Sequence, residues 1–303
     1  MKGLVFVHTG DPLEVLSLSD VVEPVPKPGE VVVEVDVRPI HPADWSFVRG
    51  TYRTRPVIPQ VAGLSGAGRI VLAGGADGLV PGTRVAFRWP GTWAERVAVP
   101  AERLIILPPD VTDEDGAQLP LNPITAWGLL DMANVQPGQW LGLTAPASSV
   151  SQLVLALAEM RGVHAVPIEG PPDTNLTERL RSITGGAGLA AVFDSVGGPL
   201  LEAVFGGLQP GATILAYGTM SDEPIAVRNA TLIYSNLSWR GFGVDRWLSS
   251  IDAVARERML ETLFEAMRTK RLPLPVRAQL PLATFREALG LSQDGSSGKV
   301  LLR

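Results

Sequence analysis

The character of the chain changes near residue 113, and this change constrains the fold more than any other feature. Before about residue 100, short apolar stretches are separated by Pro-Gly and Gly-Gly pairs. Such short strands with frequent turn signals are typical of a small barrel or sandwich. After the change, predicted strands and helices alternate, which is typical of a parallel sheet with crossover helices. The sequence therefore predicts two domains of different class.

The β-rich part is predicted from apolar stretches bounded by turns. Its expected strands are Val31–Val37, Gly68–Leu72, Arg84–Phe87 and Ala94–Val99. Two helices are expected next, at Asp113–Leu119 and Pro123–Met132.

The α/β part is predicted from apolar runs that alternate with helical patterns. Its expected strands are Trp140–Thr144, Val163–Ile168, Ala190–Phe193 and Thr213–Tyr217. The helices expected between them are Val150–Arg161, Leu176–Ile183 and Pro199–Gly206.

A long helix is predicted at about Ile251–Lys270, where apolar residues recur at helical spacing. Short strands return after Leu272, with a helix at Leu282–Leu291 between them. We therefore expect a discontinuous architecture, with a β-rich domain at 1–120 and 262–303 and an α/β domain at 121–261 inserted into it. The cleft between two domains is the default ligand site.

Composition excludes several classes of function. The 303 residues include 26 Lys and Arg against 31 Asp and Glu, a net charge of −5, which disfavours nucleic acid as a partner. No cysteine is present, so thiolate zinc sites and disulfides are excluded, and the histidines number three. We expect no bound metal. No apolar run is long enough for a signal peptide or a membrane span, so a cytoplasmic protein is expected.

A serine-rich turn follows the first strand of the α/β part. Ser148, Ser149 and Ser151 stand where a dinucleotide-binding turn usually has glycines, ahead of a predicted helix. The N–H groups at a helix N-terminus can bind a diphosphate. The serines could donate hydrogen bonds to it, or they could simply be helix N-caps.

Glu169 follows the next predicted strand, 20 residues beyond Ser149. At this spacing an acidic side chain accepts hydrogen bonds from the ribose hydroxyls of NAD and repels a 2′-phosphate. The alternative is a solvated loop residue before Pro171.

Several motifs together resemble the zinc-free branch of the medium-chain dehydrogenase/reductase superfamily, whose members include quinone and enoyl reductases. General motifs of that branch are Asp194-Ser-Val-Gly-Gly198 and Gly298-Lys-Val-Leu-Leu302. The finer ones are similar to 2-enoyl thioester reductases: Arg49-Gly-Thr-Tyr52, Gly91-Thr-Trp93, Leu121-Asn-Pro-Ile-Thr-Ala126, Ala147-Ser-Ser-Val-Ser-Gln152 and Tyr217-Gly-Thr-Met-Ser221. The resemblance covers nearly the whole chain.

This resemblance implies a GroES-like β-rich domain and a Rossmann-type doubly wound parallel sheet. The implied activity is hydride transfer from NADH or NADPH to an activated C=C bond, in an enoyl thioester or a similar α,β-unsaturated carbonyl. The implied partners are a small-molecule or acyl-thioester substrate and a second copy of the chain, in a homodimer. Two alternatives remain open: a quinone oxidoreductase, and a non-redox derivative that has lost the dinucleotide.

The resemblance also implies roles for individual residues. Tyr52 stands where the family has a tyrosine that helps to protonate the substrate or holds its carbonyl, although a surface turn residue is the alternative. The residues implied for the substrate pocket are Trp93, Asn122 and His41. Those implied for cofactor binding, beside the three serines and Glu169, are Thr125, Val150, Tyr217, Gly218 and Phe242.

The chain departs from the family pattern at four places. His41 replaces an asparagine, Ser65 replaces a glutamate, Ser149 and Ser151 replace glycines of the phosphate turn, and Glu169 replaces a basic residue that reads NADP.

A deletion is also indicated, because Leu176–Ile183 resembles a helix that normally follows a third strand and here follows the second. We therefore expect five core strands, with Val163–Ile168 at a sheet edge.

Overall fold

The computed structural model describes residues 1–75, 78–170, 175–293 and 297–303, and the chain divides into two compact units. The first unit consists of Met1–Leu121, Met267–Thr269 and Leu274–Arg303. The second unit consists of Asn122–Ala266 and Lys270–Pro273.

The first unit contains a large sheet and a small one. The small sheet has the order β2-β1-β4, formed by β1 (Lys2–Phe6), β2 (Ser17–Asp20) and β4 (Gln60–Val61). The large sheet has the order β14-β15-β3-β5-β6-β8, with β7 paired to β3. Its strands are β3 (Glu30–Pro39), β5 (Ser65–Leu72), β6 (Arg84–Arg88), β7 (Arg96–Pro100), β8 (Leu104–Ile106), β14 (Val276–Leu280) and β15 (Lys299–Leu302).

Short helices complete this unit: α1 (Pro12–Val15), α2 (Pro42–Val48), α3 (Asp113–Gln118) and α11 (Phe285–Gln293), with 3-10 turns at Ala101–Arg103 and Leu282–Thr284.

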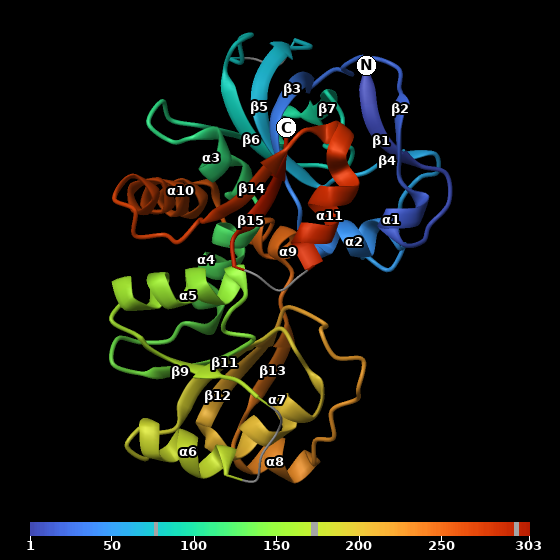
Figure 1. Ribbon diagram of the computed structural model, residues 1–303. Coiled ribbons are helices and arrows are strands. Elements are labelled where there is room, and N and C mark those ends of the chain that lie inside the picture. Colours follow the sequence, from blue (N-terminus) through green and yellow to red (C-terminus); the bar gives the residue numbers. More distant parts are fainter. Residues whose placement is uncertain (76–77, 171–174, 294–296) are drawn as a thin grey trace. The chain divides into compact units, whose positions relative to one another are not determined.

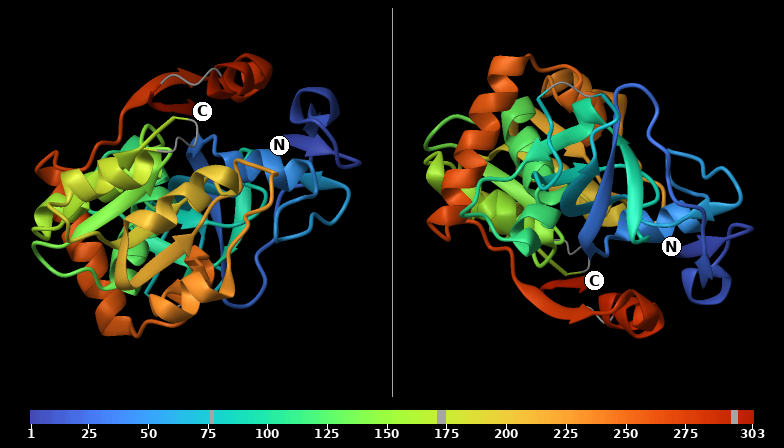
Figure 2. Two further views of the ribbon diagram at one scale, coloured as in Figure 1. Left: turned by 90° about the horizontal axis from the view of Figure 1, so that it is seen from below. Right: turned by 90° about the horizontal axis from the view of Figure 1, so that it is seen from above.

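Strand β3 organises the first unit. It pairs with β5 and β7, and near its end with β15, so the C terminus lies beside it in both views of Figure 2. A strand with neighbours on both sides is buried along most of its length, which explains its run of valines. One apolar cluster, with Val33, Ile70 and Phe87, packs on this sheet. A second includes Phe6, Phe47 and Trp93.

The second unit is a parallel sheet with the order β10-β9-β11-β12-β13. Its strands are β9 (Trp140–Thr144), β10 (His164–Ile168), β11 (Leu189–Asp194), β12 (Leu208–Ala216) and β13 (Ser238–Gly241). Helices α5 (Ser149–Met160) and α4 (Asn122–Ala133) lie on one face, while α6 (Leu176–Ile183) and α7 (Gly198–Val204) lie on the other (Figure 1).

The remaining helical segments are α8 (Asn229–Tyr234), α9 (Val244–Leu248), α10 (Ala253–Arg268) and a 3-10 turn at Phe205–Gly207. None of the helices in the described ranges is long and apolar enough to cross a membrane.

Strand β10 forms one edge of this sheet, as the sequence predicts. Within the described residues no strand lies outside it, so the expected shortening is confirmed for that part of the chain, with residues 171–174 outside the description. Pro167 is compatible with an edge strand. Proline has no backbone N–H to donate to a neighbouring strand, so it is disfavoured in the interior of a sheet. The five-stranded order therefore agrees with the local sequence.

Candidate active site

Three loops meet at the carboxyl ends of the strands of the second unit. The chain reverses direction across the sheet between β9 and β11, since β10 lies on one side of β9 and β11 on the other. In open α/β sheets ligands bind at such a reversal, outside the carboxyl ends of the strands. The sheet order alone therefore places the candidate dinucleotide site at the ends of β9, β11 and β12.

Hydrogen bonds hold these strand ends together. The buried Thr144 hydroxyl at the end of β9 donates to Asp194 at the end of β11 over 2.8 Å and accepts from the Ser195 N–H over 2.9 Å. Asp194 also accepts from the N–H groups of Val196 and Gly197. A buried carboxylate with this many donors is well satisfied, which fixes the loop after β11.

The N-terminus of α5 has donors available for a ligand. The Ser148 side chain caps the helix by accepting from the Ser151 N–H over 3.2 Å. In the described structure the N–H groups of Ser149 and Val150 bond to no other group, and both residues are partly exposed. Two free N–H groups at a helix N-terminus match the donors that a diphosphate requires. The donor set therefore fits a dinucleotide, and the capping alternative holds for Ser148 at the same time.

Ser151 is fully buried beneath this turn. Its hydroxyl donates to the Thr144 carbonyl over 3.2 Å and lies 3.3 Å from the Tyr217 hydroxyl, at the end of β12. The serine that replaces a family glycine therefore ties two strand ends together. Gly218 follows, where an added Cβ would lie 2.7 Å from the Ser195 carbonyl oxygen, so the loops after β11 and β12 can approach only if this residue is glycine.

The other predicted residues of this unit lie in different surroundings. Glu169 is exposed directly after β10, at the same edge of the sheet as the end of β9. Asn122 and Thr125 are buried in the first two turns of α4. Phe242 is buried against Trp247, with ring centroids 6.3 Å apart, which indicates a packing role for this ring.

Tyr52 lies in the first unit, in the turn after α2, and is partly buried. Its backbone N–H donates to the Ser46 carbonyl over 3.0 Å, which fixes the turn. The Arg88 guanidinium, at the end of β6, donates to the Tyr52 phenol oxygen over 2.5 Å. The phenol is therefore held from one side by a cation.

Among the buried titratable groups of the same unit, three interact electrostatically: His41, Asp44 and Lys299. Asp44 accepts a hydrogen bond from the His41 backbone N–H over 2.7 Å at the start of α2. Burial raises the pKa of Asp44 to about 7 and lowers the pKa of Lys299, on β15, to about 8. Burial, with Lys299 and Arg88 nearby, holds the pKa of His41 well below its usual range, so its imidazole is neutral.

Buried polar atoms without partners gather around this group. In the described structure the two ring nitrogens of His41, one carboxylate oxygen of Asp44, the hydroxyls of Ser65 and Thr92, and the indole nitrogen of Trp93 have no hydrogen-bond partner. Such groups are rare in proteins and costly, at about 1–3 kcal/mol each. Their concentration in one region singles it out as the polar site of this unit, which we call the buried polar cluster.

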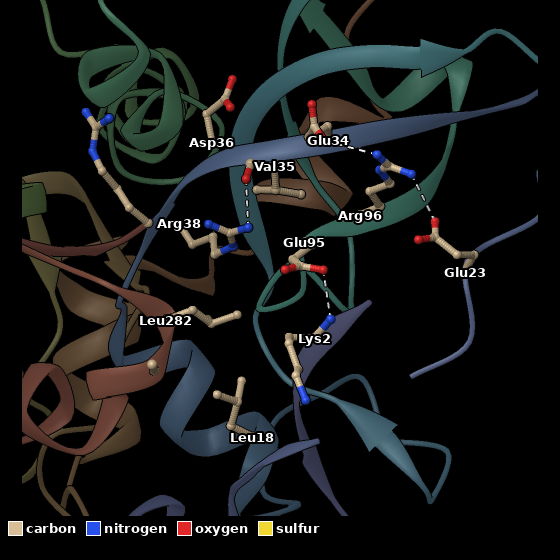
Figure 3. A pocket seen from close by; sticks show the side chains of 12 residues that line it. Lys2, Leu18, Glu23, Glu34, Val35, Asp36, Arg38, Glu95, Arg96 and Leu282 are labelled. Carbon is tan, nitrogen blue, oxygen red and sulfur yellow. Dashed lines mark hydrogen bonds and ion pairs between the residues drawn. The ribbon is translucent and has the colours of Figure 1, made fainter. Parts of the chain in front are cut away.

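A separate groove of about 600 Å³ lies elsewhere on the first unit, and Figure 3 shows its lining. None of the predicted site residues lines it. At its base the buried Arg38 donates to the carbonyl oxygens of Val35, Thr92 and Ala94 at 2.7–3.2 Å. Arg38 therefore fixes the segment that carries Trp93.

The predicted residues thus form two groups. Tyr52, His41 and Trp93 lie in the first unit, with Tyr52 facing Arg88. Ser148, Ser149, Val150, Ser151, Tyr217 and Gly218 meet at strand ends in the second unit. The sequence did not single out Asp44, Arg88, Lys299 or Arg38 as site residues, because single charged residues on separate helices and strands give no local pattern. Across the described ranges no group of three His, Asp or Glu side chains could hold a metal ion.

Two family models match the chain. The model described as alcohol dehydrogenase GroES-like domain matches residues 27–109, and the one described as zinc-binding dehydrogenase matches residues 134–269. The metal of the second name has no thiolate to bind here, since the chain contains no cysteine.

Known proteins are similar over nearly the whole length. The mitochondrial enoyl-[acyl-carrier-protein] reductase of Bos taurus is 28% identical over all of this chain and 88% of its own. A protein described as an NADPH:quinone reductase from Mesorhizobium loti is 27% identical, with a TM-score of 0.89 over 100% of this chain and 98% of its own. Escherichia coli quinone oxidoreductase, solved with NADPH, shares the fold at 21% identity and a TM-score of 0.89, over 100% and 99% of the two chains.

The resemblance indicated by the sequence motifs is confirmed. The two matched segments agree with the similar proteins and with the observed combination of a β-rich unit and a parallel-sheet unit. The chain belongs to the medium-chain dehydrogenase/reductase superfamily, with enoyl reductases and quinone reductases among its relatives.

Proposed function

We propose that this protein is a zinc-independent reductase that uses NADH or NADPH to reduce a C=C bond conjugated to a carbonyl, with an enoyl thioester as the first substrate class to test. The observation that carries the proposal is the N-terminus of α5, where the Ser149 and Val150 N–H groups have no partner among the described residues and lie at the ends of β9 and β12. The enoyl reductases among the relatives support the choice of substrate.

The proposed reaction adds one hydride and one proton across the double bond. NADH or NADPH bound at the start of α5 would supply the hydride that the β-carbon accepts. The π electrons of the C=C bond then move toward the carbonyl, leaving negative charge on its oxygen until the α-carbon takes up a proton from water. Tyr52 serves as the hydrogen-bond donor to that oxygen, because a phenol donor contributes most where negative charge develops.

We further propose that NADH binds more tightly than NADPH. Glu169 is exposed at the end of β10, where it would accept from ribose hydroxyls and face a 2′-phosphate as a like charge.

Two other functions have a specific observation in their favour. Quinone reduction is supported by the relatives that are described as quinone reductases, and it needs the same hydride donor. A non-redox role is favoured by Ser151, whose buried hydroxyl stands where the family has a glycine beside the diphosphate.

A homodimer is part of the proposal. Strand β13 is an edge of the second unit's sheet and its four residues are all exposed, with the exposed Tyr234 on the preceding helix α8. An exposed strand edge has unpaired N–H and C=O groups that a second copy could pair. Light scattering is expected to give about twice the chain mass of 32.2 kDa, and a mass of one chain would contradict this part.

The test of the proposed function is turnover. The purified protein is incubated with NADH or NADPH and a panel of enoyl thioesters, enones and quinones, and oxidation of the cofactor is followed by its ultraviolet absorbance. We expect oxidation with an enoyl substrate and a saturated product by mass spectrometry. Oxidation with quinones alone would assign the second candidate function, and no oxidation with any acceptor would favour the non-redox role.

A further inference from the structure

The contact between Arg88 and Tyr52 has a direction. A guanidinium has only N–H donors and cannot accept a hydrogen bond. In the 2.5 Å contact the Tyr52 phenol oxygen must therefore be the acceptor. The hydroxyl hydrogen of Tyr52 is left to point elsewhere, and among the described residues no acceptor for it is found. The contact thus leaves the phenol with an available donor.

The environment of Arg88 keeps the guanidinium in place. The residue ends strand β6, where it pairs with Ser65 of β5, and its guanidinium carbon lies 6.0 Å from the centre of the Tyr52 ring. Tyr52 itself packs against the apolar cluster that contains Phe47 and Trp93. Both partners are therefore fixed by strand pairing and packing, and the hydrogen bond does not depend on two flexible surface side chains.

The charge of Arg88 also suits the chemistry of Tyr52. When the phenol donates to an oxygen that gains negative charge, part of that charge is transferred to the phenol oxygen. A cation bonded to the same oxygen stabilises this state more than the ground state, and more strongly in a partly buried site than in water.

We propose that Arg88 is a positioning residue for the reduction: it holds the Tyr52 oxygen as an acceptor and so directs the hydroxyl hydrogen to the carbonyl oxygen of the substrate. The inference rests on the proposed function, since it needs a substrate whose carbonyl gains charge. Arg88 acts through Tyr52 and need not touch the substrate.

The test is a double-mutant cycle with Arg88→Met and Tyr52→Phe. Charge-assisted hydrogen bonds support a loss in kcat of about 10- to 100-fold for Arg88→Met on the best enoyl substrate. The KM for the dinucleotide is expected to change less than about twofold. In the Tyr52→Phe background Arg88→Met is expected to cause no further loss, because the partner atom is already gone.

Two further variants separate this role from a merely structural one. Arg88→Lys keeps a charged donor and is expected to recover part of kcat, and Arg88→Gln keeps a neutral donor and is expected to recover less. If Arg88→Met does not fold, the comparison of kcat between Arg88→Lys and Arg88→Gln still tests whether the charge of Arg88 matters. The matched control is Arg84→Met on the same strand, whose guanidinium bonds Asp113, and it should retain the wild-type kcat.

The outcomes distinguish this inference from the proposed function. The role of Arg88 is overturned if the wild-type protein reduces the substrate and Arg88→Met has the same kcat. It is also overturned if the loss of kcat in Arg88→Met adds fully to the loss in Tyr52→Phe. In both cases the proposed reductase function is retained. If the wild-type protein binds no nicotinamide and reduces no acceptor, the proposed function is overturned and the role of Arg88 with it.

Discussion

Individual residues divide between those with a local signal in the sequence and those without one. Tyr52, Trp93 and Ser148 belong to short motifs, so the sequence could single them out. Arg88 and Lys299 are single charged residues on strands β6 and β15, and they matter only because the sheet order brings them near α2. A sequence read alone cannot predict such neighbours, since they lie more than two hundred residues apart along the chain.

The first prediction concerns the proposed donor. Tyr52→Phe is expected to lower kcat for C=C reduction about 100-fold, because the lost hydrogen bond is strongest in the transition state. The affinity for the dinucleotide should stay unchanged, as its proposed contacts belong to the other unit. Steady-state kinetics and a cofactor titration measure the two effects. Unchanged turnover with an authentic substrate would mean that the donor is another group.

The second prediction concerns cofactor choice. In the wild-type protein NADH is expected to bind several-fold more tightly than NADPH, because repulsion between Glu169 and a 2′-phosphate at an exposed site is on the order of 1 kcal/mol. Glu169→Gln removes the negative charge and should narrow the ratio of the two dissociation constants. Glu159→Gln, an exposed residue of α5, is the control. A wild-type preference for NADPH would remove Glu169 from this role.

At the scale of elements, the sequence predicted the regular ones best. The expected strand Trp140–Thr144 and helix Leu176–Ile183 coincide with β9 and α6, since strong apolar patterns with clear ends define them. The long helix expected at about Ile251–Lys270 is shorter at both ends, at Ala253–Arg268. A fifth strand was expected in the parallel sheet, but the sequence did not predict which residues form it.

Strand β13 and helix α2 are two of the elements that the sequence did not predict. Strand β13 (Ser238–Gly241) has four exposed residues without alternation, and it exists because β12 offers it a partner. Helix α2 (Pro42–Val48) is short, and its stability comes from burial of Trp45, Phe47 and Val48 in the core. Both elements depend on tertiary contacts, which local sequence propensity cannot predict.

The prediction at this scale concerns the start of α5. Ser148→Ala removes the side-chain cap on the Ser151 N–H and is expected to destabilise the second unit by about 1 kcal/mol. Ser149→Ala, one residue further on, removes a hydroxyl that forms no hydrogen bond within the described part of the chain, and it should change stability little. Urea denaturation of both variants measures the difference. Equal effects would show that Ser148 does not cap the helix.

At the scale of the whole molecule, the buried polar cluster is expected to make stability depend on pH. The pKa of Asp44 is raised to about 7 from 3.8, so between these values the folded state retains a proton that the unfolded chain has released. Asp44 therefore contributes a fall in stability as the pH rises through this window, by on the order of 4 kcal/mol. His41, whose pKa is lowered, contributes a rise in stability up to about pH 6.5 and so opposes part of this fall. Lys299 acts in the opposite sense, since its lowered pKa of about 8 makes stability rise from there toward pH 10.5.

Asp44→Asn tests this dependence. The variant cannot lose a proton at this position, so the fall in stability between about pH 4 and pH 7 should be smaller than in the wild-type protein. Denaturation midpoints at several pH values provide the comparison, with Glu102→Gln, an exposed residue of the same unit, as the control. A fall of the same size in Asp44→Asn and wild type would contradict the assignment to Asp44.

The chain is expected to bind a reduced nicotinamide dinucleotide despite its serine-rich phosphate turn, and the proposed reduction depends on this binding. A titration of the full-length protein with NADH and NADPH, followed by cofactor fluorescence and by the melting temperature, tests it most directly, with adenosine as a control that lacks the diphosphate. We expect saturable binding, tighter for NADH, and about 2.7 kcal/mol of added stability at a ligand concentration one hundred times the dissociation constant. No change in fluorescence or melting temperature with either dinucleotide at millimolar concentration would contradict it.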